Sequence, residues 1–231
     1  MEINVKNVKY QYQNENSFVL KGINMHIEEG KITGILGKSG SGKTTLLEMF
    51  NALRIPSEGT IEIGDFCIGK NIDIDVTNLR FQVGLVFQFP EDQFFALTVK
   101  EELELPLKFY NYNKNKIEER IISSLQMVGL DPSYLDKNPQ TLSNGEKRKV
   151  ALASILVLNP SILVLDEPTI GLDSESASNF IKLLRLLKRR YNKTIIIASH
   201  NTELLHKIVD YLYVINDGKV VLEGNKYDVL K

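Results

Sequence analysis

The sequence predicts an α/β fold with an antiparallel lobe at its start and a helical lobe inserted into its middle. Three observations support it: alternating segments near the N-terminus, short apolar segments that are each followed by a helical pattern, and helical periodicity between two of those segments. Residues 3–12 and 19–27 alternate between apolar and polar side chains, and residues 60–63 continue that character. Such alternation is typical of half-exposed antiparallel strands.

The short apolar segments predict buried parallel strands, in contrast to the half-exposed antiparallel strands near the N-terminus. Ile32–Leu36 and residues 162–165 and 194–198 are apolar nearly throughout, and a helical pattern follows each. Buried parallel strands in an α/β core have this texture. Residues 117–128 and 143–158 show helical periodicity between the first and second of these strands, which predicts the inserted helical lobe.

Composition limits the function classes. Lys and Arg total 28 against 29 Asp and Glu, so the chain lacks the basic excess typical of nucleic-acid-binding proteins, and no nucleic-acid partner is expected. The basic run Lys147-Arg148-Lys149 is interpreted as a solvated helix face.

The one cysteine, Cys67, can form neither an intrachain disulfide nor a cysteine-based metal site, and is expected to be a buried small hydrophobe. Apolar runs stop short of the roughly 20 residues that cross a bilayer, so we expect a soluble chain.

The strongest chemical signal is a glycine-rich segment between a predicted strand and a predicted helix. It matches the phosphate-loop pattern at every fixed position, which disfavours an ordinary glycine-rich turn. Backbone N–H groups and the positive helix end converge there on one anion. Lys43 is expected to reach the β- and γ-phosphates of ATP, and the Thr44 hydroxyl to bind Mg²⁺. The predicted nucleotide-binding residues are Gly37, Ser39, Gly40, Ser41, Gly42, Lys43, Thr44 and Thr45.

Two adjacent carboxylates end the apolar segment at residues 162–165. Asp166 and Glu167 are expected at the carboxyl edge of a parallel sheet, where ligands bind in open α/β folds. Asp166 would hold Mg²⁺ through its water shell, and Glu167 would orient and polarise the attacking water as general base. A solvated strand end before Pro168 is the alternative, and a neighbouring phosphate loop makes it the weaker interpretation.

Shortly before this strand, residues 142–146 read Leu-Ser-Asn-Gly-Glu, which resembles the signature of ABC-type ATPases. The flanking motifs occur in the family's order. Gln88 resembles the glutamine that links the catalytic core to the helical lobe and contributes to the Mg²⁺ site. Asp173 belongs to a Gly-Leu-Asp sequence that resembles the loop reaching the partner subunit, and His200 resembles the switch histidine.

The resemblance spans nearly the whole chain and implies a P-loop NTPase fold of ABC type, with a mixed sheet core, an antiparallel β subdomain and an inserted helical subdomain. Residues 1–231 would form one ABC ATPase domain, with residues 1–88 and 160–231 as catalytic core and β lobe and residues 89–159 as helical lobe. Tyr12 resembles the aromatic residue on which adenine stacks, although Tyr10 is also available.

In the family, each nucleotide lies between the phosphate loop of one subunit and the signature of another. The resemblance therefore implies that Ser143, Gly145 and Asp173 act in trans, in a dimer with an identical chain or with a paralogous ATPase. Asn144 and Glu146 depart from the family's usual Leu-Ser-Gly-Gly-Gln. Ser143 and Glu146 form the pattern of a capping box, so Glu146 can turn back to the Ser143 N–H. A carboxylate near the γ-phosphate would weaken dimer closure unless it is held away.

A narrower resemblance follows Gln88. Residues 90–94 read Pro-Glu-Asp-Gln-Phe, which is similar to energy-coupling-factor importers, whose paired ATPases drive uptake of vitamins or of cobalt and nickel ions. This implies an ATP-hydrolysing subunit that docks on a transmembrane partner near residues 88–96, at the cytoplasmic face of the membrane. Soluble ABC ATPases, such as iron–sulfur assembly factors, and ATPases of other ABC importers or exporters remain alternatives.

The aromatic residues of this segment allow two interpretations. Phe89, Phe94 and Phe95 would form an apolar docking patch rimmed by Glu91 and Asp92, as in helix-in-groove binding. Alternatively, they pack the helical lobe onto the core.

Overall fold

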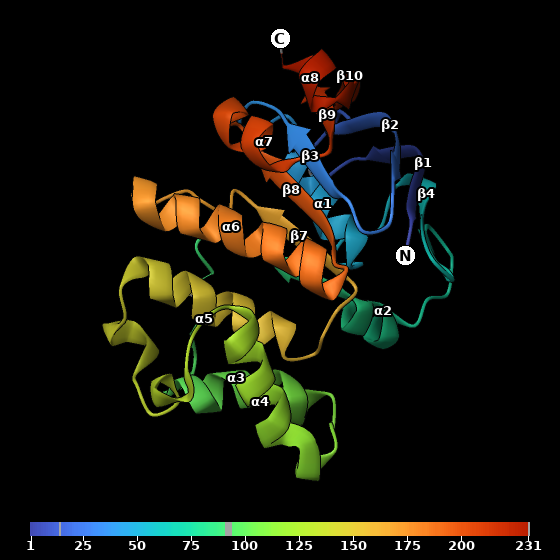
Figure 1. The fold of residues 1–231 in the computed structure, drawn as a ribbon. Helices are drawn as coiled ribbons and strands as arrows, with labels where there is room; N and C mark the ends of the chain where they lie inside the picture. The colour runs from blue at the N-terminus through green and yellow to red at the C-terminus, as the bar shows by residue number, and fades with distance from the viewer. Residues whose placement is uncertain (14, 91–93, 231) are drawn as a thin grey trace.

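In a computed structural model, residues 1–13, 15–90 and 94–230 are described, and they form an antiparallel sheet and a mostly parallel sheet with helices between and around them (Figure 1). The antiparallel sheet has the order β2-β1-β4-β5 and consists of β1 (Ile3–Tyr10), β2 (Leu20–Ile27), β4 (Glu58–Ile63) and β5 (Phe66–Gly69). The other has the order β10-β9-β3-β8-β7-β6 and consists of β3 (Ile32–Leu36), β6 (Val83–Val86), β7 (Ile162–Asp166), β8 (Thr194–Ser199), β9 (Tyr211–Asn216) and β10 (Lys219–Asn225).

The helices divide into those that cover the sheets and those that extend away from them (Figure 1). The covering helices are α1 (Lys43–Phe50), α2 (Val76–Gln82), α6 (Ser174–Tyr191), α7 (Thr202–Ile208) and α8 (Lys226–Val229). Between β6 and β7 the chain forms α3 (Val99–Phe109), α4 (Ile117–Met127) and α5 (Asn144–Leu156), which pack on one another at the end of the molecule opposite the antiparallel sheet. This is the helical insertion that the sequence predicts.

Successive side chains of the parallel strands point to opposite faces of the sheet, so the sheet has one hydrophobic core on each face. In β8, Ile196 and Ala198 face the core that contains α1 and the antiparallel sheet. Ile195 and Ile197 face the opposite core, which contains residues of α3 to α7. Strands buried on both faces need apolar residues at every position, which is why these segments lack alternation. Helix α1 is thereby fixed between the two sheets, and the loop that precedes it is fixed with it.

The predicted strand and helix segments are confirmed, with shifts at their ends. Strand β1 stops at Tyr10, two residues before the predicted end, because Tyr10 pairs with Leu20 and its carbonyl accepts from Val19 N–H as the chain turns. This leaves Tyr12 outside the sheet. The hairpin of β9 and β10 was not predicted, although Asp217 and Gly218 have φ of 46° and 71° and form the Asp-Gly turn that favours such hairpins.

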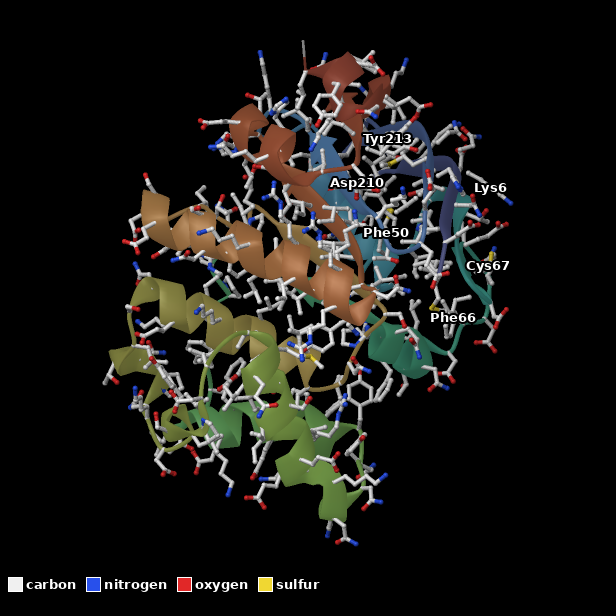
Figure 2. All side chains as sticks on the ribbon, in the orientation of Figure 1. Lys6, Phe50, Phe66, Cys67, Asp210 and Tyr213 are labelled. Atoms are coloured by element: carbon white, nitrogen blue, oxygen red, sulfur yellow. The ribbon has the colours of Figure 1, made fainter. Side chains whose placement is uncertain are left out.

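Two sequence interpretations are wrong. Arg148 is fully buried, not on a solvated face, because α5 packs there against the loop after β7 and the guanidinium Nη2 donates to Ile170 O at 3.0 Å. Cys67 is half-buried rather than buried, because β5 is an edge strand; it lies with Phe66 at the side of the molecule formed by the antiparallel sheet (Figure 2). Among the described residues, no helix combines the length and the apolar character required to cross a bilayer.

Candidate nucleotide-binding site

The phosphate loop joins β3 to α1. Gly42 has φ of 102°, and a Cβ there would lie 2.6 Å from Leu20 Cδ2, so glycine is required. Gly42 is the N-cap of α1 and makes no side-chain cap, so the first N–H groups of this helix can bind an anion. Lys43 is buried, and its ammonium group donates to Gly37 O at 2.7 Å and Lys38 O at 3.1 Å. The loop therefore curves around a positive charge.

Thr44 and Asp166 meet beside this charge. The Thr44 hydroxyl donates to Asp166 Oδ2 at 2.6 Å, which joins the start of α1 to the end of β7. Burial raises the pKa of Asp166, partly offset by the hydrogen bond from Thr44. A hydroxyl and a carboxylate at one point form an oxygen donor set suited to Mg²⁺, which prefers one or two protein oxygens together with water and phosphate. The residues present therefore fit this metal.

Glu167 is held in an unusual conformation next to Asp166. Its φ is 45°, a left-handed conformation that is costly for a residue with a Cβ and that clusters at functional sites. Carboxylate oxygen Oε1 lies 2.7 Å from His200 Nδ1 and accepts from His200 N–H at 2.9 Å, and Oε2 accepts from the Ser199 hydroxyl at 2.8 Å. Ser199 is buried. The end of β8 therefore orients the carboxylate that was predicted to act as base.

These groups open into one cavity of about 410 Å³. Tyr12 lines it and bonds through its hydroxyl to Thr45 Oγ1 at 2.8 Å, whereas Tyr10 is not among the described lining residues, which favours Tyr12 as the stacking residue. Gln88 also lines it. The predicted residues gathered here are Tyr12, Ser39, Gly40, Gly42, Lys43, Thr44, Thr45, Gln88, Asp166, Glu167 and His200.

Two predicted loop residues lie behind the cavity wall. The Ser41 side chain packs under Gly37, where an added Cβ would meet Ser41 Oγ at 2.5 Å and Ile215 O at 2.6 Å. Gly37 is thus required for close packing of the loop on β9. Any contact of Ser41 with a phosphate would come from its backbone.

A larger cavity, of about 630 Å³, lies between β2, β9 and β10. Its walls include Glu28, Asp210 and Glu223 but nothing of the phosphate loop. This cavity has the larger volume, but the smaller cavity is the better candidate for the nucleotide site, because an anionic ligand needs the N–H groups and the lysine of the phosphate loop.

A second cluster holds the remaining predicted residues. Ser143 caps α5, and Asp173 caps α6 by accepting from Ser176 N–H at 2.8 Å. A Cβ on Gly145 would lie 3.1 Å from Ser176 Oγ, so the starts of α5 and α6 are in contact. Ser143, Gly145 and Asp173 are not among the described residues that line the phosphate-loop cavity.

The aromatic residues of the predicted docking segment have different environments in the structure. Phe94 packs against the core that the helices α3 to α7 share with the parallel strands, as expected if it packs the helical lobe onto the core. Phe95 is 85% exposed and Phe89 is 39% exposed. Glu102 fixes the segment through its Oε2, which accepts from the N–H groups of Phe95 and Ala96, both at 2.9 Å. The proposed rim residues Glu91 and Asp92 lie outside the described residues.

Three residues of the site were missed by sequence reasoning. Val19 and Ile170 line the cavity, and Ser199 bonds to Glu167. Proximity to His200 in the chain was a usable signal for Ser199. Val19 and Ile170 carry no chemical signal, because an apolar wall residue has the same side chain as a core residue.

Comparison with known proteins gives one consistent family. The ABC transporter family matches residues 20–170. The energy-coupling factor transporter ATP-binding protein EcfA2 of Clostridium perfringens is 37% identical over 235 residues, which cover 100% of this chain and 82% of that protein. The EcfA2 of Spiroplasma kunkelii is 38% identical over 237 residues, covering 100% of this chain and 77% of that protein.

Solved structures agree. CbiO1 from Clostridium perfringens, part of the ABC transporter complex CbiONQ, superposes with a TM-score of 0.89 at 35% identity, covering 99% of this chain and 90% of that one. The ATP-binding cassette MJ0796, in a dimeric post-hydrolysis state bound to ADP and Pi, superposes with a TM-score of 0.82 at 31% identity, covering 97% and 98%.

Proposed function

Since this chain belongs to the ABC transporter family and is an ATP-hydrolysing subunit of the energy-coupling factor type, we propose that it closes with a second ATPase subunit around Mg-ATP and passes that motion to a transmembrane partner. The observation that carries the proposal is the convergence of Lys43, Thr44, Asp166 and Glu167 on one cavity from α1, β7 and the phosphate loop. The same cavity is lined by His200, which contacts the Glu167 carboxylate.

Each group has a defined task in hydrolysis. The N–H groups of the phosphate loop and Lys43 bind and orient the β- and γ-phosphates. Thr44 and Asp166 would hold Mg²⁺, with Gln88 as a further ligand from the lobe side; the ion supplies charge neutralisation on the phosphates when bound. Adenine stacks on Tyr12, whose hydroxyl is fixed by Thr45.

Glu167 accepts the proton of the attacking water. Glu167 lines the cavity with φ of 45°, and Ser199 and His200 hold its carboxylate in one orientation through hydrogen bonds to both oxygens. A positioned general base of this kind contributes about 10² to 10⁴ in rate. Because His200 contacts the same carboxylate, its position depends on what Glu167 binds.

The second cluster acts on the partner subunit's nucleotide. Ser143, Gly145 and Asp173 are held together by the contact between α5 and α6 and are outside their own subunit's cavity, so we assign them to the opposite site of a head-to-tail dimer. The MJ0796 cassette was captured as a dimer with ADP and Pi, which supports this arrangement. The γ-phosphate offers the start of α5 an anion that ADP lacks.

Closure would move residues 89–159 as a lobe against residues 1–88 and 160–231. The lobe carries Phe95, Leu97 and Phe109, which are 85%, 75% and 78% exposed. We assign residues 88–96 as the contact with a helix of the transmembrane subunit, at the cytoplasmic face of the membrane, where Phe95 would be covered. The membrane subunits set the cargo, a vitamin or a cobalt or nickel ion.

Glu167→Gln tests the reaction and the dimer together. It should keep Mg-ATP binding, lower the hydrolysis rate by about two to four orders of magnitude, and give a dimer with ATP but monomer with ADP. Light scattering and phosphate release measure both, and Glu203→Gln on α7, an exposed carboxylate paired with Lys207, is the matched control. Near-normal turnover would remove Glu167 as base. A protein that stays monomeric with ATP would exclude the homodimer in favour of a paralogous partner subunit.

A further inference from the structure

The Glu146 carboxylate has a definite position, which bears on how this signature works. Glu146 stands at the third position of α5, within one turn of the N–H groups that would face a γ-phosphate. Its Oε2 accepts from the Ser143 N–H at 2.9 Å and from the Ser143 hydroxyl at 2.7 Å. Its Oε1 accepts from the Tyr134 hydroxyl at 2.5 Å. The carboxylate thus lies between the signature serine and a tyrosine of the helical lobe.

Tyr134 comes from a short 3₁₀ turn, Pro132–Tyr134, that precedes α5 in the chain. Asp131 caps this turn by accepting from Ser133 N–H at 2.8 Å, which fixes the backbone of Tyr134. The Lys137 ammonium lies 3.6 Å from the centroid of the Tyr134 ring, a cation–π contact that fixes the ring. Both Tyr134 and Glu146 are half-buried. The backbone cap and the ring contact therefore both restrain the tyrosine that donates to Glu146.

The hydrogen bonds keep Glu146 charged. Donation from Tyr134 first, and from Ser143 second, lowers the pKa of Glu146 to about 2, so the carboxylate is an anion at every working pH. An anion at the start of α5 competes with the γ-phosphate for the same N–H groups and the same serine hydroxyl. A neutral residue at this position would not compete with the γ-phosphate for these donors.

We propose that Tyr134 is a positioning residue for the signature, which holds the Glu146 carboxylate toward the lobe so that Ser143 can turn its hydroxyl to the γ-phosphate of the partner site. When Ser143 turns, Glu146 loses one donor. The Tyr134 hydroxyl and the Ser143 N–H remain, so the carboxylate keeps two charge-assisted hydrogen bonds and stays in place. This inference rests on the proposed action of Ser143 in trans.

Tyr134→Phe removes the donor and keeps the ring. The Glu146 carboxylate would then depend on Ser143 alone, hold the serine hydroxyl more tightly and oppose closure. A hydrogen bond to a charged group contributes about 1.5–3 kcal/mol, which corresponds to roughly a tenfold to hundredfold weaker closure. Nucleotide affinity of the monomer should stay within about twofold, because the phosphate loop is in the other cluster.

The double substitution separates positioning from structure. In Tyr134→Phe with Glu146→Gln there is no carboxylate to hold, so ATP-dependent dimerisation should return to within about threefold of the parent. All variants are made in the Glu167→Gln background and measured by light scattering with ATP, and monomer affinity is measured by titration calorimetry. Tyr112→Phe, which removes a hydroxyl from another tyrosine of the lobe, is the control and should resemble the parent.

Steady-state hydrolysis in the assembled transporter, with Glu167 intact, is the second measurement. Tyr134→Phe should lower kcat about tenfold or more with little change in KM, and the added Glu146→Gln should restore it. A Tyr134→Phe protein that matches Tyr112→Phe in both assays overturns the proposal, as does a defect that Glu146→Gln does not repair. Failure of the proposed function looks different, because the parent proteins themselves would then neither dimerise nor hydrolyse ATP.

Discussion

The substitution Arg148→Met tests whether the Arg148 guanidinium, on α5, is buried against the loop that leads to Asp173. Arg148 is fully buried, and its Nη2 donates to Ile170 O at 3.0 Å. Ile170 precedes Asp173 by three residues, so this contact ties the first turns of α5 to the loop that leads to Asp173. Methionine keeps most of the apolar stem and removes the donor.

The magnitude follows from the contact. A hydrogen bond from a charged group contributes about 1.5–3 kcal/mol, and the smaller side chain adds a cavity term, so we expect a loss of about 3 kcal/mol in the free energy of unfolding. For a chain of this size that corresponds to a fall of about 6–12 °C in Tm. Urea unfolding followed by circular dichroism measures it, with an unchanged slope showing that the unfolded state is unaffected.

Lys149→Met is the matched control on the same helix. Lys149 is half-buried, and its substitution should change stability by no more than about 0.5 kcal/mol. Equal effects of the two substitutions would refute the burial of Arg148 and restore the solvated basic face that the sequence pattern indicates.

Three further predictions concern the site and its support. Lys43→Ala should weaken ATP binding at least tenfold by calorimetry, because it removes the charge inside the phosphate loop; unchanged affinity would contradict the assignment of the loop. Ser199→Ala removes one of the donors to Glu167 and should lower kcat about tenfold with KM nearly constant, whereas an unaltered kcat would show that Glu167 needs no such support. Burial lowers the pKa of Lys193 to about 8 from 10.5, so the unfolded chain binds a proton between these values that the folded chain releases. Stability should therefore rise by up to about 3 kcal/mol from pH 8 to 10.5, and Lys193→Met should remove this rise in urea unfolding; parallel pH profiles of the two proteins would contradict it.

Local chemistry explains what was predictable. The phosphate loop is a contiguous segment whose glycine spacing, lysine and threonine are each required by the geometry of anion binding, so its position between β3 and α1 follows from the sequence. The apolar runs of β3, β7 and β8 are readable because burial on both faces leaves no room for polar positions. The capping box of Ser143 and Glu146 lies within four consecutive residues at one helix start, and the structure contains it.

Contacts between distant segments explain what was not predictable. The pairing of Thr44 with Asp166 joins residues 122 positions apart, and it exists because α1 and β7 pack side by side. A charge run indicates a solvated face when only helix period is considered, yet Arg148 is buried because a separate loop folds over it.

The sequence by itself therefore determined the chemistry: a phosphate loop, two carboxylates, a signature and an α/β core, each encoded within a few consecutive residues. Tertiary structure alone decided which of these groups share a cavity and which lie outside it. It also placed Tyr134 on Glu146, a contact between a loop and a helix start that no local pattern specifies. The physical reason is that side-chain position depends on how elements pack, and packing is a property of the whole chain.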